Sequence, residues 1–585
     1  MKTNPASSTD SEPVIQKDRP LPAPRSALVG INQWDWIFAL FFLAFAGIYF
    51  LGRLQANYPI VILSGDGGNI ASYAAALDHP GWFQDDPALG ASNNIGIYAT
   101  IHIPLIRAMY RLTGDYGLAY AWLVFPQTFL QLLGFYILGR VLFTRTCGTG
   151  TGKNRFWAFI LAFLTAMTVI NIGLGEIWGV WQDALPRVTF QSLLPFLLAL
   201  TLVWRERPGR WPWLMLFTGL LVYVHPISAP AWGLAIWLSL WLLQPKGWSW
   251  KRRSLVMLGL GFLFLLVLTP YALNYLSYRG RDQSADYNTV MAILQTYSPA
   301  NLLNVPAALG GFLWNSTKSL LLPLALVGFV ATWLLKKSDR TDLKLVLIWM
   351  AGLFITSVLI PFAEQLVEQR FHILPFETEL VRCIRYFVPL LLIFWIWPLA
   401  EWTPRLTNPL ARRSAIAVGI VLFGFWGATN RPAVRDIFQT FVCFTHARLV
   451  CPAPGPLNEL ILTLRTQTQP GQGVLVFNED TAYVSQSLSV RYAALRPLVY
   501  TLRDSGLLGY SNRSALPGWL ATTQQMDSLR AMTDPQVRLA GLVPLAKSLG
   551  AVYLVVDFGV APEMLNSLPV SVVMQNESYL LLKLH

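Results

Sequence analysis

The sequence predicts a polytopic α-helical membrane protein, with about eleven transmembrane helices followed by a small C-terminal α/β domain. Three observations favour this fold class. Mean hydropathy over the 585 residues is +0.45. Only 13% of residues are charged, whereas soluble proteins carry about 25%. The 23 tryptophans are typical of helices that are anchored by aromatic rings at the membrane surfaces.

The first predicted span begins near residue 36, after a polar, proline-rich segment at 1–34. We expect this segment to be a disordered cytosolic tail, because an apolar run that starts so late does not fit a cleavable signal peptide. The predicted bundle covers residues 35–428. Its apolar runs lie at 36–53, 118–143, 156–173, 188–204, 212–224, 228–243, 254–271, 319–335, 344–362, 387–400 and 414–428.

Basic residues predict the orientation of these spans. The segments after the even-numbered spans contain Arg140, Arg145, Lys153, Arg155, Arg205, Arg207, Arg210, Lys246, Lys251, Arg252, Arg253, Lys336, Lys337, Arg340, Lys344, Arg405, Arg412 and Arg413. Short basic loops face the cytosol, so we expect a cell-membrane protein with a cytosolic N-terminus and an extracytoplasmic C-terminal domain. This pattern accounts for the net charge of +13 and gives no reason to expect a nucleic-acid partner.

The predicted external loops hold most of the carboxylates of the membrane part. These are Asp66, Asp78, Asp85, Asp86, Asp115, Glu176, Asp183, Asp282, Asp286, Glu364, Glu368, Glu377 and Glu379. Polar groups gathered on one side of a bundle indicate a functional surface there. The alternative is that external loops merely lack selection for Lys and Arg.

A change of pattern near residue 456 predicts the soluble domain, 456–585, after a linker at 429–455. Short β-branched runs predict strands at 473–478, 497–501 and 551–557, and a closing hairpin at 571–575 and 579–584. Helical spacing appears near 515–531 and 537–549. Strands that alternate with helices predict a small, mostly parallel sheet.

Several familiar motifs are excluded. The glycine-rich stretch 148–153 lacks the Gly and the Ser or Thr of a phosphate-binding loop, having Cys147 and Asn154 at those positions. The four cysteines show no metal-binding spacing and the histidines form no helical pair, so we predict no zinc site. Cys443 and Cys451 follow the last predicted span on the oxidising side, and we expect them to form a disulfide.

The first external loop carries the candidate catalytic residues. Asp66 lies among small residues, in Ser-Gly-Asp-Gly-Gly at 64–68, where a substrate can approach closely. Asp85 and Asp86 are adjacent, and mutual repulsion raises one pKa of such a pair. This suits a general base or the binding of a cation, so a divalent cation is an option that the sequence leaves open. The alternative is that both segments are turns.

Four later residues are candidates for substrate binding. His225, followed by Pro226, reverses the chain at the external membrane edge. Arg382 and Arg385 lie just before the tenth span, where two arginines suit a lipid-linked phosphate. They could equally bind anionic headgroups or pair with nearby glutamates. Arg187, in the second external loop, is a weaker candidate of the same kind.

Together these features resemble the GT-C superfamily of lipid-dependent membrane glycosyltransferases, and in particular poorly characterised bacterial members. The resemblance rests on the Gly-Asp-Gly segment at 64–68, Phe-Gln-Asp-Asp-Pro at 83–87, His225 with Pro226, and the final α/β domain. It implies a polyprenyl-phosphate-linked sugar donor and an inverting transfer outside the cytosol, as in cell-envelope assembly. It also implies that Asp66, or one of Asp85 and Asp86, is the base, while Arg382 and Arg385 neutralise the leaving phosphate.

A second function class is a non-catalytic membrane protein, such as a transporter or an assembly scaffold whose external domain binds a partner. A transporter is expected to carry charges in mid-span, beside an aqueous path. The predicted spans are nearly free of charge, and charged residues gather at the surface. This distribution favours chemistry on a lipid headgroup.

Overall fold

A computed structural model gives the structure of the chain. It describes residues 31–585 except 56–57, 64, 91, 148–152, 172–176, 180–182, 244–246, 280–284, 298–302, 336–339, 377–378, 404–407, 428–430, 452–453, 480–483, 558 and 561. Almost all of the predicted tail and the glycine-rich stretch after Cys147 therefore lie outside the described residues.

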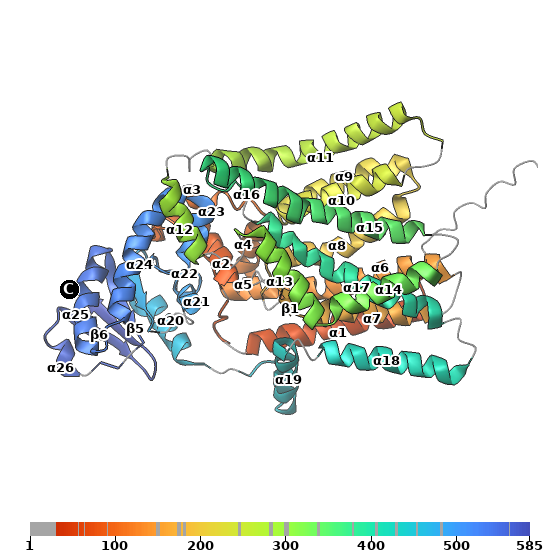
Figure 1. Cartoon of the computed structure of the whole chain (residues 1–585). Helices are drawn as coiled ribbons and strands as arrows, with labels where there is room; N and C mark the ends of the chain where they lie inside the picture. The colour runs from red at the N-terminus through yellow and green to blue at the C-terminus, as the bar shows by residue number, and fades with distance from the viewer. Residues whose placement is uncertain are drawn as a thin grey trace, which may run out of the picture.

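A bundle of roughly aligned helices forms the larger part of the molecule (Figure 1). Each predicted span coincides with a helix. These helices are α1 (Gln33–Gln55), α6 (Val124–Cys147), α7 (Lys153–Met167), α8 (Pro186–Trp204), α9 (Trp211–Leu220), α10 (Ser228–Leu242), α11 (Trp250–Arg279), α14 (Leu321–Leu335), α15 (Thr341–Phe354), α17 (Phe387–Trp402) and α18 (Pro409–Gly427).

Six helices in the described part of the chain are long and apolar enough to cross a membrane, or seven if the bent pair α13 (Val305–Lys318) and α14 is one span. Apolar side chains also face outward, as expected beside lipid. On α11 these include Leu255, Leu258, Phe262 and Leu265. The polytopic membrane fold is thus confirmed, while the number of about eleven spans stays a prediction.

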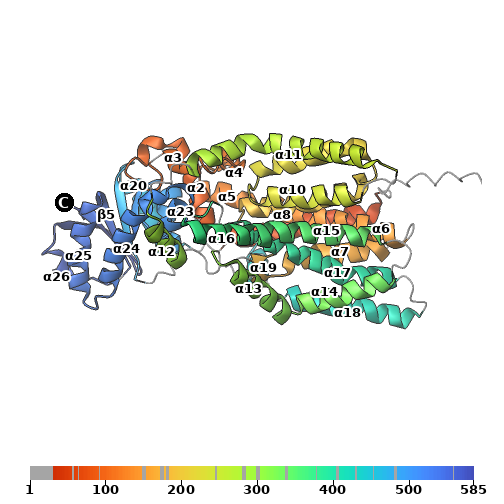
Figure 2. The same cartoon turned by 45° about the horizontal axis from the view of Figure 1, so that its top comes forward.

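Several helices occur in the predicted external loops. They are α2 (Gly65–Asp78), α4 (His102–Thr113), α5 (Tyr116–Trp122), α12 (Tyr287–Tyr297), α13, α16 (Ile360–Phe371) and the 3-10 helix η6 (Leu380–Tyr386). In both views α2 and α12 lie at the end of the bundle that meets the C-terminal domain (Figures 1 and 2). α2 and α12 therefore belong to an intermediate layer between the bundle and this domain.

The C-terminal domain contains a five-stranded sheet in the order β4-β3-β5-β7-β6. The strands are β3 (Gly473–Phe477), β4 (Leu498–Tyr500), β5 (Ala551–Val556), β6 (Val570–Gln575) and β7 (Leu580–Leu584). β3 pairs in parallel with β4 and β5, whereas β7 pairs antiparallel with β5 and β6. The sheet is mixed rather than mostly parallel, because the closing hairpin joins it directly beside β5.

The helices of this domain are also close to their predicted positions. α24 (Leu516–Arg530) and α25 (Pro535–Ser548) match the two helical patterns, and α20 (Pro456–Gln467) and α23 (Asp504–Ser511) are additional. The small α/β fold of the C-terminal part is confirmed. The exact division of the chain into domains stays a prediction.

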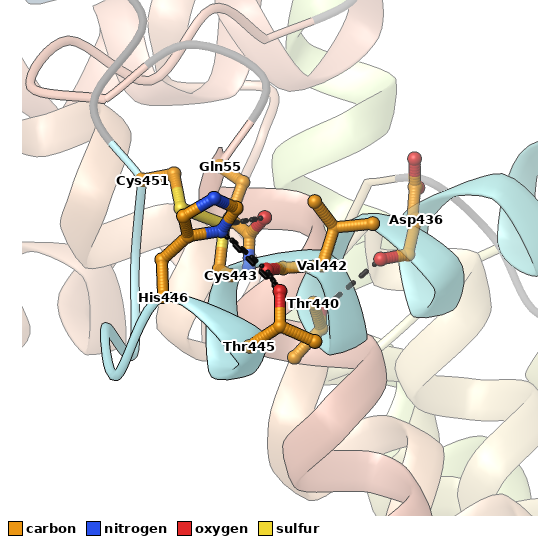
Figure 3. The surroundings of a disulfide bond; sticks show 8 residues. All are labelled: Gln55, Asp436, Thr440, Val442, Cys443, Thr445, His446 and Cys451. Atoms are coloured by element: carbon orange, nitrogen blue, oxygen red, sulfur yellow. Dashed lines mark hydrogen bonds between the residues drawn. A yellow bond between two sulfur atoms is a disulfide. The ribbon is translucent and has the colours of Figure 1, made fainter.

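The segment predicted as a linker contains a helix, α19 (Arg431–Thr445), which packs against α1. The predicted disulfide between Cys443 and Cys451 is present, with their Cα atoms 5.7 Å apart. It lies beside Gln55, the last residue of α1 (Figure 3). The chain is therefore attached to the bundle just before it enters the C-terminal domain.

Candidate functional site

A cavity of about 420 Å³ lies where the bundle, the intermediate layer and the C-terminal domain meet. Its walls come from α2, the start of α8, the turn before α10, η6 and α23. Four of the predicted site residues line it: Asp66, Arg187, His225 and Arg382. The structure thus brings together side chains that are separated by more than three hundred positions in the sequence.

Helix α2 presents one face to this cavity. Asp66, Asn69, Ile70 and Tyr73 all line it, and their spacing of three, four and seven residues puts them on the same side of a helix. Asp66 is in the first turn, where a carboxylate interacts favourably with the helix dipole. Its side chain is 60% exposed, and Oδ2 lies 3.3 Å from Nη1 of Arg187. Asp66 is therefore an accessible carboxylate held beside a mostly buried arginine.

His225 lies in the turn between η3 (Leu221–Tyr223) and α10. The backbone N–H of Ser228 donates to Nδ1 of His225 at 3.2 Å, which places the ring proton on Nε2. Ser228 Oγ is 2.7 Å from the same Nδ1 and 2.5 Å from the hydroxyl of Tyr386. Burial, together with the positive charge of nearby arginines, lowers the pKa of His225 well below its usual value. His225 is thus a neutral imidazole at neutral pH, with a single N–H to donate.

The two predicted arginines of η6 have different positions. Arg382 lines the cavity, and its Nη1 lies 3.0 Å from Oε1 of Glu379, which lines it too. Arg385 is only 1% exposed and is not among the lining residues. Its Nε donates to the carbonyl oxygen of Arg382 at 2.9 Å. Arg385 therefore supports the backbone that carries Arg382.

Asp85 and Asp86 are not brought into the cavity lining. Asp85 is exposed, while Asp86 is buried and receives two hydrogen bonds from Arg491 of the C-terminal domain, at 2.7 and 2.8 Å. The backbone N–H groups of Ala88, Leu89 and Leu498 also donate to Asp86. Asp86 therefore joins the external loop to the C-terminal domain. The sequence had suggested a general base here instead.

Arg503 and a row of three tyrosines, Tyr73, Tyr98 and Tyr510, are among the lining residues that the sequence did not indicate. The rings of Tyr73 and Tyr98 are 4.8 Å apart, and those of Tyr98 and Tyr510 are 5.1 Å apart. Their planes are tilted by 36° and 43°, so the three rings form a contiguous but curved aromatic surface. Arg503 and Tyr510 belong to the C-terminal domain. The helical spacing from Asp66 to Tyr73 could have indicated Tyr73, but no local signal marks Tyr98, Arg503 or Tyr510.

A second cavity, of about 780 Å³, adjoins the first. The two share Pro226, Ile227, Tyr271 and Tyr510 as lining residues. Most other residues of the second cavity are apolar and come from α11 and α16, among them Leu268, Leu276, Ile360 and Val367. A cavity with charged lining residues (the polar cavity) therefore adjoins a mostly apolar one that lies between α11 and α16 (the apolar cavity).

The acidic side chains of the polar cavity decide whether it can hold a metal ion. Among the residues that the structure describes, no three His, Cys, Asp or Glu side chains gather as they would around a metal ion. The carboxylates of the polar cavity, Asp66 and Glu379, each have an arginine partner. The described residues therefore do not fit a built divalent-cation centre.

Similarity to known proteins is found among solved structures. No protein-family model matches the sequence, and a search of curated proteins finds no similar sequence. The chain is similar to the solved structure titled "Crystal Structure of ArnT from Cupriavidus metallidurans bound to Undecaprenyl phosphate", with a TM-score of 0.49 and 14% sequence identity. The match covers 94% of this chain and 98% of that one. Similarity at this level does not by itself assign an activity or a ligand to the chain.

Proposed function

We propose that this protein is a GT-C-like membrane glycosyltransferase. It would transfer a sugar from a polyprenyl-phosphate-linked donor to an acceptor hydroxyl on the extracytoplasmic side. The observation that carries the proposal is the pair of adjoining cavities. One is lined by Asp66, Arg187 and Arg382, and the residues of the other are mostly apolar, with Glu364 and Glu368 of α16 as its charged members. A polyprenyl-phosphate-linked donor is divided in the same way, because its phosphate and sugar are polar and its long hydrocarbon chain is apolar.

In this proposal the apolar cavity holds the first part of the polyprenyl chain, and the phosphate lies in the polar cavity. Arginine suits this position, because its planar guanidinium can donate two hydrogen bonds to one phosphate. Arg382 would be the principal phosphate ligand, while the neutral His225 would donate an N–H to a phosphate or sugar oxygen. The sugar would stack on the row formed by Tyr73, Tyr98 and Tyr510.

The transfer is a single displacement at the anomeric carbon. The acceptor hydroxyl oxygen forms the new bond to that carbon, and its proton passes to the carboxylate of Asp66 as general base. The bond between the anomeric carbon and the phosphate oxygen breaks, and its electron pair leaves with polyprenyl phosphate. Arg382 stabilises the negative charge that develops on this leaving group. Attack opposite to the leaving group inverts the anomeric configuration.

Asp66→Asn tests this proposal, because it keeps the size of the side chain but cannot accept the proton. With purified protein, polyprenyl-phosphate-linked sugars and a cell-envelope extract that supplies acceptor hydroxyls, we expect release of polyprenyl phosphate to fall by about two orders of magnitude or more. Asp85→Asn is the matched control: it removes an exposed carboxylate outside the cavity and should leave the rate unchanged.

The same pair of variants separates the enzyme from a transporter or a scaffold. A non-catalytic protein would release no polyprenyl phosphate from any of the donors. In cells, its glycoconjugates would also be unchanged by Asp66→Asn. Either result would overturn the proposed function.

A further inference from the structure

We infer that Arg503 of the C-terminal domain is a binding residue for the phosphate of the lipid-linked substrate, so that this domain completes the site. The inference rests on the proposed function and extends it to a part of the chain outside the membrane bundle. It departs from the view that the C-terminal domain is a separate module for a protein partner.

The position of Arg503 follows from the topology of the sheet. β4 pairs in parallel with β3 and ends at Tyr500, and α23 begins at Asp504. Arg503 is therefore in the turn at the carboxyl end of a parallel strand, which is where α/β sheets commonly bind ligands. This turn and the helix after it line the polar cavity, through Arg503, Ser505, Gly506 and Tyr510 among others.

The guanidinium of Arg503 also lies against the start of α2. A Cβ atom built on Gly65 would be 3.4 Å from Cζ of Arg503. Gly65 directly precedes Asp66, the proposed general base. Arg503 of the C-terminal domain therefore lies at the same end of the cavity as Asp66.

A buried ion-pair cluster fixes this arrangement. Arg491 donates to both oxygens of Asp504 at 2.7 and 3.1 Å, and to both oxygens of Asp86 at 2.8 and 2.7 Å. The side chains of all three residues are at most 3% exposed. Because Asp504 follows Arg503 in the chain, the cluster ties the turn that carries Arg503 to the external loop of the bundle.

A second attachment lies on the other side of α2. The hydroxyl of Tyr492 accepts the backbone N–H of Leu63 at 2.9 Å and donates to the carbonyl of Val61 at 3.1 Å. The side chain of Leu488 is 3.1 Å from the position of a Cβ on Gly68. The domain is therefore packed against the segment on both sides of Asp66, and one wall of the polar cavity would be missing without it.

The charges of the cavity agree with a phosphate ligand at this wall. Arg187, Arg382 and Arg503 line it, together with the carboxylates Asp66 and Glu379. Arginines on two sides of a cavity can bind several oxygens of one phosphate, and Arg503 lies on the side formed by the C-terminal domain.

The test measures binding of two probes to the full-length protein in detergent: a polyprenyl phosphate and the polyprenol without the phosphate. For Arg503→Gln we expect the Kd for polyprenyl phosphate to rise by about tenfold or more, as for the loss of a charged hydrogen-bond partner. Polyprenol binding should not change. Arg503→Lys should fall between wild type and Arg503→Gln, because it keeps the charge but loses the two-pronged geometry.

The control variant is Arg465→Gln, which removes a partly exposed arginine of the same domain that does not line the cavity. It should bind both probes as wild type does. If Arg503→Gln bound polyprenyl phosphate as wild type does, or weakened both probes equally, the inference would be overturned. The proposed function would survive that result if Arg382→Gln still weakened phosphate binding. Failure of the wild-type protein to bind polyprenyl phosphate would overturn both.

Discussion

Adjacent residues Asp85 and Asp86 show how differently two identical side chains can be used. Asp85 is exposed, whereas Asp86 is buried against Arg491 and accepts backbone N–H groups from two segments. Burial raises the pKa of Asp504, the third member of the cluster, above its usual value, even though Arg491 acts in the opposite direction. Arg491 is therefore the cation that compensates two buried carboxylates.

Asp86→Ala should destabilise the protein by about 3–5 kcal/mol, because it leaves a buried arginine with half of its partners. Asp85→Ala is the matched control and should change stability by no more than about 0.5 kcal/mol, as is usual for an exposed position. Thermal unfolding of the two purified variants in detergent compares them directly. An Asp86→Ala protein that unfolds at the wild-type temperature but has lost glycosyl transfer would show instead that Asp86 is a catalytic residue.

At the scale of elements, the contact between α1 and α19 depends on a glycine. A Cβ atom on Gly52 would be 2.1 Å from the carbonyl oxygen of Asp436, so the two backbones touch there. Arg53, the next residue, pairs with the Asp436 side chain at 3.2 Å. The disulfide between Cys443 and Cys451 closes the chain shortly after this contact. These interactions dock α19 against the end of α1.

Gly52→Ala should separate α19 from α1 and destabilise the protein by about 1–3 kcal/mol, the usual range for an overpacked contact. Gly47→Ala, on the same helix, is the control. The nearest atom to its new methyl group would be 3.9 Å away, and alanine favours a helix over glycine by about 1 kcal/mol. Thermal unfolding measures the stability of the two variants, and limited proteolysis measures how readily the chain is cleaved after α19. Equal behaviour of the two variants would contradict a tight contact at Gly52.

The membrane helices and the strands of the C-terminal domain could be predicted from the sequence, because each depends on a local pattern of apolar residues. Helix α2 could not, since its first residues, Gly-Asp-Gly-Gly, also favour a turn. In the structure these glycines serve packing: a Cβ on Gly67 would lie 3.2 Å from Tyr120, and one on Gly68 would lie 3.1 Å from Leu488. Such a requirement arises only when distant segments meet.

The same reason limited the prediction of the site. Asp66, Arg187, His225 and Arg382 could be proposed because they lie just outside predicted spans, on the side of the membrane where the carboxylates gather. The partner of Asp86 is Arg491, which is 405 positions away in the chain, and nothing near either residue indicates the other. Arg503 was missed for a similar reason, because its neighbours in sequence belong to an ordinary α/β domain.

At the scale of the whole molecule, the two ends of the bundle have different chemistry. At one end Asp35, near the start of α1, pairs with Arg140 and Arg155, which lie at the end of α6 and the start of α7. At the other end α1 finishes at Gln55, beside the disulfide and the connection to the C-terminal domain. The basic loops and the C-terminal domain are therefore at opposite ends of α1.

This polarity predicts the topology of the protein in the membrane. Basic loops stay in the cytosol, and the disulfide requires an oxidising compartment. A phosphatase reporter that is active only outside the cytosol should therefore be active when fused after His585. A fusion truncated at Lys251, in the basic segment at the start of α11, should be inactive although it is expressed to a similar level. The opposite pattern of activity would place the polar cavity on the cytosolic side, where the substrate would have to be a lipid-linked sugar presented from the cytosol.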